Sequence, residues 1–86
     1  MYRAMFSRRA EKVFMDLTDR EARRIKEAIQ RLAENPRARG TIKLEGAPVA
    51  RYRYRIGDYR ILFDIDDEAK IIEILDIRKR DERTYK

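Results

Sequence analysis

The first half of the chain carries hydrophobic residues at helical spacing. Ser7 can cap a first helix, and the inner face of that helix is predicted to hold Ala10, Val13, Phe14 and Leu17. Thr18 and Glu21 form a capping box that starts a second helix, whose inner face is predicted to hold Ala22, Ile25, Ile29 and Leu32. Asn35-Pro36 ends this helix, because the residue before a proline disfavours helical geometry. The pattern predicts an αα-hairpin with a very short connection.

The second half alternates hydrophobic and polar residues, which is typical of strands with one buried face. Strands are predicted over 51–56, from Tyr59 onward and over 71–77, with short ones over 2–6 and 41–44. The buried face of the middle strand is predicted to hold Tyr59, Ile61, Phe63 and Ile65. Residues 66–69 form its closing turn. The sequence therefore predicts one α+β domain over residues 1–86: a short N-terminal edge strand and an αα-hairpin packed on a small antiparallel meander.

Gly57-Asp58 predicts a two-residue hairpin turn, because glycine readily supplies the positive φ of a type II′ turn. A turn of this length places Arg55 opposite Arg60 and Arg53 opposite Leu62. Arg51 then lies opposite Asp64 and is expected to form an ion pair with it. Directly opposed like charges destabilise a strand pair by up to about 1 kcal/mol. The facing arginines therefore favour a polyanionic ligand, or else they splay into water or reach Glu73.

The face that carries these arginines is also predicted to hold an apolar patch. Its members are Leu62 and Leu75, with Ile71 and Ile77 as companions. Apolar residues on an uncovered sheet face suggest a surface that a partner covers. A C-terminal segment that folds back over them is the alternative.

Composition adds a basic surface to this fold. The 86 residues carry a formal net charge of +6, and arginine greatly outnumbers lysine. Arginine binds phosphate through paired hydrogen bonds and stacks on bases, so the surplus favours nucleic acid. Heat adaptation accounts for the same surplus, since ion-pairing residues are frequent and Cys is absent. The exposed helix arginines are most simply solvated surface, because glutamates alternate with them.

Several chemistries are excluded by the residues that are missing. The chain has no His and no Cys, so it lacks the usual general base, thiolate nucleophile and transition-metal ligands. No glycine spacing matches a nucleotide-binding loop, and we expect no metal or cofactor. No apolar run approaches the roughly 20 residues of a membrane span, and no signal peptide is evident, which predicts a soluble cytoplasmic protein. Clustered arginines suit phosphoryl transfer.

The chain resembles the RelE/ParE toxin superfamily over essentially its whole length. The resemblance lies in the order of the predicted elements and in Lys43-Leu44-Glu45-Gly46, the run 52–60 (YRYRIGDYR), and Arg78-Lys79-Arg80 with Tyr85 near the end. It implies a RelE-like toxin that enters the ribosomal A site and cuts messenger RNA. The implied partners are the ribosome, messenger RNA and a small RelB-like antitoxin that wraps the toxin in a hetero-oligomer.

The resemblance also implies roles for individual residues. Arg60 and Arg80 bind the scissile phosphate and stabilise a pentavalent transition state, while Arg53 and Arg55 hold the RNA backbone. Tyr85 stacks on a base or assists proton transfer, although simple packing of Tyr85 on the domain is equally consistent with the sequence. The implied catalytic set is Arg55, Arg60, Arg80 and Tyr85, and the implied RNA-binding set is Lys43, Arg53, Arg78 and Lys79.

The chain departs from the superfamily pattern at two positions. Well-studied members carry lysine where this chain has Arg53 and Arg55, and one such lysine is the proposed base. Arginine does not deprotonate in proteins, so either a base role falls to Tyr85, Glu45 or a ribosomal group, or cleavage is slow. A ParE-like toxin that inhibits DNA gyrase without cutting RNA is the alternative, as is a protein that binds RNA or antitoxin without catalysis.

Overall fold

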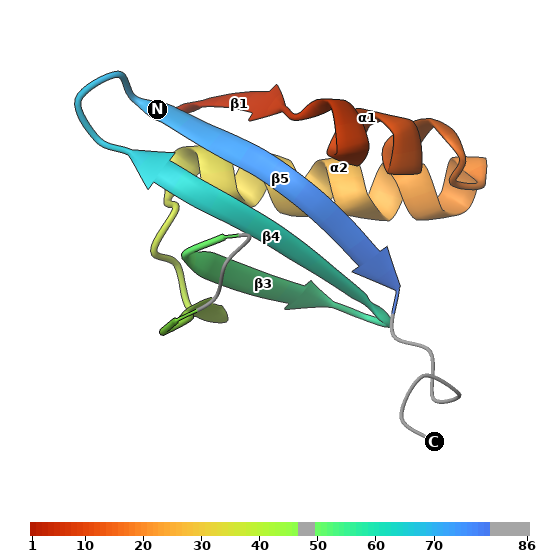
Figure 1. Cartoon of the computed structure of the whole chain (residues 1–86). Helices are drawn as coiled ribbons and strands as arrows, with labels where there is room; N and C mark the ends of the chain where they lie inside the picture. Colours follow the sequence, from red (N-terminus) through yellow and green to blue (C-terminus); the bar gives the residue numbers. More distant parts are fainter. Residues whose placement is uncertain (47–49, 80–86) are drawn as a thin grey trace.

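The computed structural model describes residues 1–46 and 50–79, in which two helices pack on one face of a five-stranded mixed sheet (Figure 1). The elements are β1 (Arg3–Phe6), α1 (Arg8–Met15), α2 (Asp19–Glu34), β2 (Thr41–Lys43), β3 (Tyr52–Ile56), β4 (Tyr59–Asp66) and β5 (Ile71–Lys79). This architecture confirms the α+β prediction of a helix pair followed by a meander. No helix in the described ranges has the length and apolar character needed to cross a membrane.

Side-chain caps start both helices at the predicted residues. The Ser7 hydroxyl accepts a hydrogen bond from the Ala10 amide at 3.1 Å and caps α1. Thr18 and Glu21 form the predicted capping box of α2, each side chain bonded to the backbone amide of the other. Each such cap satisfies an amide that has no partner within the helix. The caps therefore define the ends of the αα-hairpin locally.

The sheet has the order β1-β5-β4-β3-β2, and β1 is parallel to β5 while the other pairs are antiparallel. The N-terminal strand is thus an edge strand, as predicted, and it makes the sheet mixed rather than purely antiparallel. Gly57 has a φ of +56°, and the two-residue turn it opens joins β3 to β4. The resulting register confirms that Arg55 lies opposite Arg60 and that Arg53 lies opposite Leu62.

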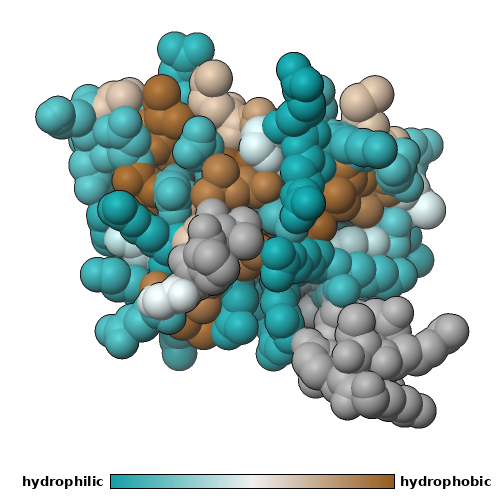
Figure 2. All heavy atoms as spheres, viewed as in Figure 1, coloured by the Kyte–Doolittle hydropathy of each residue, from teal (hydrophilic) through white to brown (hydrophobic). Residues whose placement is uncertain are grey.

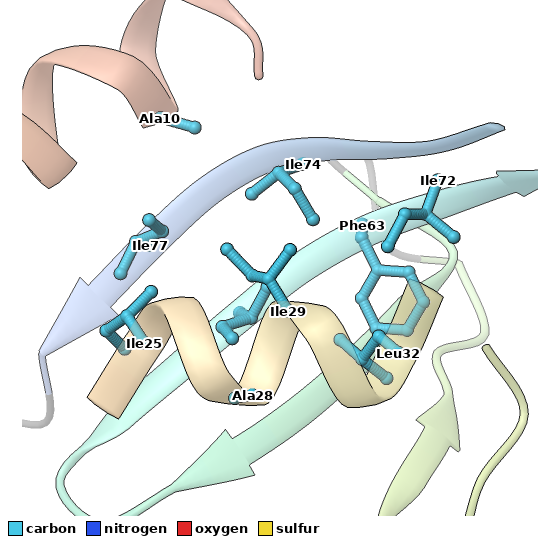
Figure 3. Close-up of a cluster of buried hydrophobic side chains, with 10 residues drawn as sticks. Ala10, Ile25, Ala28, Ile29, Leu32, Phe63, Ile72, Ile74 and Ile77 are labelled. Carbon is cyan, nitrogen blue, oxygen red and sulfur yellow. The ribbon is translucent and has the colours of Figure 1, made fainter. Parts of the chain in front are cut away.

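The core lies between α2 and the sheet (Figure 3). Phe63 on β4 is fully buried and stacks on Tyr52 of β3 with ring centroids 5.7 Å apart. The helices contribute Ala10, Ile25, Ala28, Ile29 and Leu32, and the sheet contributes Ile61, Phe63, Ile72, Ile74 and Ile77. Burial of these side chains on one face leaves the other face of β3, β4 and β5 without a helical cover (Figure 1).

The structure corrects the predicted apolar patch on that uncovered face. Ile77 lies opposite Ile61 and is buried in the core. A register shift in the pairing of β4 with β5, at Leu62 and Phe63, changes the alternation and places Leu75 at the irregularity. Leu62 does face away from the helices, but it is only 7% exposed. A β-bulge inserts one residue into a strand, and period-two counting from sequence cannot anticipate it.

Two further predictions about this part of the chain are also wrong. Pairing with β4 continues as far as Lys79 opposite Tyr59, so Arg78 and Lys79 belong to β5 rather than to a tail. Arg51 meets Asp64 through its backbone, since the Arg51 amide donates to Asp64 Oδ1 at 2.7 Å. The predicted ion pair between their side chains is not among the contacts of the described residues.

Polar contacts tie the β4–β5 turn to the chain start and to the loop after α2. Both carboxylate oxygens of Asp67 accept hydrogen bonds from the Arg37 guanidinium, at 3.0 and 2.9 Å. The Tyr2 hydroxyl also donates to Asp67, at 2.6 Å. These bonds, with Arg37 as the largest cause, lower the pKa of Asp67 to about 2. The acidic turn is therefore partly structural.

Truncation of Phe63 tests the core. We expect Phe63→Ala to lower the free energy of unfolding by about 3–5 kcal/mol, because it removes a fully buried ring and leaves a cavity. Met15→Ala is the control, since Met15 is 75% exposed and its truncation is expected to change stability by less than about 0.5 kcal/mol. Urea unfolding measures both, and equal effects would contradict the assigned core.

Candidate nucleic-acid interface

A row of three arginines crosses the uncovered face of the sheet. Arg55 on β3 lies opposite Arg60 on β4, and Arg60 lies opposite Arg78 on β5. We call Arg55, Arg60 and Arg78 the basic row. Their neighbours Ile61 and Ile77 point into the core, so alternation turns the arginines to the opposite face. Hydrophilic residues dominate this face of the molecule, with hydrophobic atoms visible between them (Figure 2).

The adjacent row toward the middle of the strands combines one cation, one apolar residue and one anion. Arg53 lies opposite Leu62, and Leu62 lies opposite Asp76. The Nε of Arg53 is buried and has no hydrogen-bond partner. Within residues 1–46 and 50–79, neither Arg53 nor Arg55 forms an ion pair. These two guanidinium groups are therefore not committed to a local carboxylate.

Asp76 orients one end of the basic row. It is only 5% exposed, and its Oδ2 accepts a hydrogen bond from Arg78 Nε at 2.9 Å. Its Oδ1 accepts from the Ile77 amide, also at 2.9 Å, and Arg9 Nη1 lies 3.8 Å from Oδ2. A buried carboxylate that loses its cationic partner is strongly destabilising. Arg78 thus has a structural role in addition to any role in binding.

The basic row is an arrangement that binds anions well. Directly opposed like charges oppose strand pairing, and a bound phosphate would remove that repulsion. Each guanidinium can donate two parallel hydrogen bonds to a phosphate and keeps its charge at any physiological pH. A sheet face that holds these groups in fixed register presents them in advance of binding, which favours charge developing on a phosphoryl group.

The structure does not bring every predicted RNA-binding residue to this face. Lys43 lies opposite Tyr52, whose ring packs on the core residue Phe63, so by register Lys43 shares the other face of the sheet. Lys79 also turns to the helix side, where its Nζ lies 4.0 Å from a Glu21 carboxylate oxygen. Arg80 and Tyr85 lie outside the described residues. The arrangement of the basic row therefore concerns Arg55, Arg60 and Arg78 alone.

The hairpin tip is fastened to the start of α2. Desolvation is the largest cause that raises the pKa of the Tyr59 phenol to about 12, and a hydrogen bond with Glu21 adds to it. The capping bond from Thr18 is the largest cause that lowers the pKa of Glu21. Lys79 lies over the Tyr59 ring, with Nζ 5.9 Å from its centroid. This phenol is thus a positioning contact between helix and hairpin, on the face opposite the basic row.

An apolar groove beside β1 is a feature that sequence reasoning missed. The groove has a volume of about 690 Å³ and lies between β1 and the two helices. Met5 is 47% exposed and Met15 75% exposed. Residues that line the groove include Met5, Phe6, Phe14, Met15 and Ile29. The sequence signal was present, since Met5 and Phe6 are consecutive and Met15 falls outside the inner stripe of its helix.

Comparisons with known proteins assign this chain to a family. The family described as "ParE toxin of type II toxin-antitoxin system, parDE" matches residues 4–84. This chain belongs to that toxin family. It is a toxin of a toxin–antitoxin system with the RelE/ParE fold. No curated protein matches the chain.

Solved structures support the same assignment. The archaeal RelE-RelB complex from Pyrococcus horikoshii OT3 contains a chain that is 32% identical, with a TM-score of 0.78 over 94% of this chain and 97% of that one. A chain of the RelBE2 toxin–antitoxin complex of Mycobacterium tuberculosis is 29% identical, with a TM-score of 0.80, and the match covers 92% of this chain and 98% of that one. The isolated E. coli RelE toxin, 24% identical with a TM-score of 0.80 over 99% and 92%, shows the shared fold.

Neutralisation of Arg55 tests the electrostatics of the basic row. We expect Arg55→Gln to raise the free energy of unfolding by up to about 1 kcal/mol, because it removes the repulsion with Arg60. The gain should shrink in high salt, which screens exposed charges. Arg39→Gln, on the exposed loop before β2, is the control with the same charge change. Loss of stability in Arg55→Gln would contradict the inference that Arg55 and Arg60 repel each other in the folded protein.

Proposed function

We propose that this toxin is a metal-independent endoribonuclease that cleaves messenger RNA in the ribosomal A site. The observation that carries the proposal is the basic row on a sheet face without helical cover. Arg53, which like Arg55 forms no ion pair in the described part of the chain, extends the cationic surface along β3. Proteins that contact single-stranded RNA combine a cationic surface of this kind with stacking side chains.

The proposed reaction is an internal transfer at phosphorus. The ribose 2′-hydroxyl attacks the adjacent phosphorus, the bond to the 5′-oxygen breaks, and the products carry a 2′,3′-cyclic phosphate and a 5′-hydroxyl. Negative charge grows on the phosphoryl oxygens in the transition state, where Arg60 and its neighbours in the basic row would stabilise it. Arg80, which lies outside the described residues, would act with Arg60 as the superfamily resemblance implies.

Proton transfer in this reaction must come from a group other than arginine. Glu45 is poorly placed for that role, because its loop meets the chain just before β3, where the Leu44 amide donates to the Arg51 carbonyl. Arg51 lies four residues along the strand from Arg55, a distance of about 13 Å. We therefore assign the proton transfer to Tyr85 or to a group of the ribosome, and not to Glu45.

We further propose that a RelB-like antitoxin covers the apolar groove. β1 is an edge strand of the sheet and exposes apolar side chains beside the groove. Exposed apolar grooves are typical seats for amphipathic helices and added strands. Related structures from P. horikoshii and M. tuberculosis are toxin–antitoxin complexes. The groove also has polar lining residues with which a specific partner can form hydrogen bonds or ion pairs, namely Glu11, Lys26 and Gln30.

Inhibition of DNA gyrase is a second candidate, because the matching family is described by its ParE toxin. A gyrase inhibitor acts by binding a protein and has no need of a phosphate-binding row. Since one fold hosts different activities, the choice between the two candidates depends on the charged face. We favour the nuclease because three arginines in register oppose strand pairing and gain most from a phosphate ligand.

Removal of Arg60 tests the nuclease proposal. We expect expression of the wild-type toxin to halt translation and to produce codon-phased cuts in messages on translating ribosomes, detected by primer extension. Arg60→Ala should lower the cleavage rate by about 10²-fold or more, because it removes transition-state stabilisation. Arg60→Lys should restore only part of it, since an ammonium keeps the charge but loses the paired donors.

The control for this test is Arg39→Ala, which removes an exposed arginine outside the basic row and should cleave at the wild-type rate. Circular dichroism verifies that each variant is folded. Intact messages together with arrested DNA supercoiling would refute the nuclease and support the gyrase inhibitor. Full cleavage by a folded Arg60→Ala toxin would remove the basic row from the mechanism.

A charge placed in the apolar groove tests the antitoxin seat. We expect Met15→Glu to remain folded, because Met15 is 75% exposed, and to weaken antitoxin binding by about 2 kcal/mol or more. The binding partner for calorimetry is the product of the reading frame adjacent to the toxin. Ile42→Glu is the matched control, since Ile42 is 48% exposed on the strand at the opposite edge of the sheet. Equal weakening of antitoxin binding in both variants would contradict the proposal that the antitoxin binds in this groove.

A further inference from the structure

The charges on the uncovered sheet face are segregated along the strands. The basic row lies at the end near the β3–β4 turn. Toward the other end, Asp64 on β4 lies directly opposite Glu73 on β5. We call Asp64 and Glu73 the acidic pair. The acidic pair and the basic row share one face, because Asp64 lies four positions after Arg60 on β4 and every second side chain of a strand points to the same face.

This segregation is not what folding alone would favour. Like charges that face each other across a strand pair are destabilising, and opposite charges are stabilising. The face contains three such pairings of like charge: Arg55 with Arg60, Arg60 with Arg78, and Asp64 with Glu73. An exchange of Arg60 with Asp64 would give three pairs of opposite charge. The Asp64 carboxylate accepts a hydrogen bond from the Arg51 amide, whereas Glu73 is exposed and forms no ion pair with any described residue.

The separation of the two groups determines how they act on each other and on a ligand. Asp64 lies four residues from Arg60 on β4, which corresponds to about 13 Å. Exposed charges separated by more than about 8 Å are largely screened at physiological ionic strength. The acidic pair therefore does little to neutralise the basic row. It does repel a phosphate that passes directly over it, at a hollow of about 580 Å³ that Asp64 and Glu73 help to line.

We propose that the acidic pair determines the path and length of the RNA segment that this face accepts. This inference rests on the proposed function, because it concerns the RNA that the basic row would bind. Adjacent strands lie about 4.8 Å apart, so the basic row spans about 10 Å across β3, β4 and β5. An RNA strand follows the row across the strands, because a path along them would carry its phosphates over Asp64 and Glu73. The face thus contacts a short stretch of backbone.

The salt dependence of binding tests this inference, since its slope counts the phosphates in contact. For single-stranded nucleic acid the logarithm of affinity falls with the logarithm of salt by about 0.7 for each contact. The probes are a tetranucleotide and a dodecanucleotide of 2′-O-methyl RNA, which cannot be cleaved, with a fluorescent label for anisotropy. We expect the wild-type toxin to give equal slopes for the two, since the acidic pair prevents further phosphate contacts along the strands.

The informative variant is the double substitution Asp64→Asn with Glu73→Gln. We expect it to steepen the slope for the dodecanucleotide by about one contact, 0.7, or more, and to leave the slope for the tetranucleotide unchanged. Glu27→Gln with Glu34→Gln is the matched control, because it makes the same charge change at two exposed positions of α2. The control should give equal slopes for both probes, as the wild-type toxin does.

The outcomes separate this inference from the proposed function. A folded wild-type toxin that binds neither probe at low salt would overturn RNA binding itself, and the inference with it. Binding by the wild-type toxin with no length-dependent gain in the double variant would overturn the inference alone. A gain of the same size in the α2 control would also overturn it, because net charge would then explain the effect.

Discussion

The register of the β3–β4 hairpin is the constraint on which the rest of the structure depends. Side chains alternate between faces along a strand, so a slip of one residue would move Phe63 to solvent and Arg60 into the core. A two-residue turn prevents the slip, and Gly57 meets its requirement for a positive φ, at +56°. A Cβ at that position would lie 2.7 Å from the Arg24 guanidinium, so the turn is also closely packed by α2. The positive φ is what favours glycine there, because the Arg24 guanidinium is the end of a flexible side chain and can move aside.

The same register gives the two faces of the sheet different roles, because one packs the core and the other carries the charged side chains. On one face, helix α2 and the strands bury the apolar side chains that provide most of the stability (Figure 3). Burial of a single large ring such as Phe63 contributes about 3–5 kcal/mol. An opposed pair of like charges loses up to about 1 kcal/mol. The core can therefore tolerate a basic row and an acidic pair that folding would not select.

Asp76 links the stable part of the molecule to its charged face. It is almost fully buried beside the open part of β5, and it holds Arg78 from the same strand. The guanidinium at this end of the basic row is therefore oriented by the fold, whereas Arg53 and Arg55 form no ion pair within the described ranges. Family membership identifies a toxin, and related toxins share this fold. The arrangement of charge is the basis for proposing RNA as the target, because fold alone does not specify activity.

Local sequence determined the helices, their caps and the hairpin register, because each of these depends on residues close together in the chain. Ser7, Thr18 and Glu21 bond to backbone only three residues away, and Gly57-Asp58 sets the pairing of its own flanking strands. The pairing of Arg55 with Arg60 was therefore predictable. The third member of the row was not, since Arg78 joins it only through the pairing of β5 with β4.

Tertiary structure alone decided what depends on contacts between distant segments. The irregular pairing at Leu62 and Phe63 sent Ile77 into the core and turned Asp76 to the face of the arginines, against a simple alternation. Sequence patterns also could not show that Lys43 and Lys79 face away from the arginines. Their direction depends on how β2 pairs with β3 and how β5 pairs with β4. The apolar groove likewise needs β1 beside two helices, an arrangement made by the parallel pairing of the first and last strands.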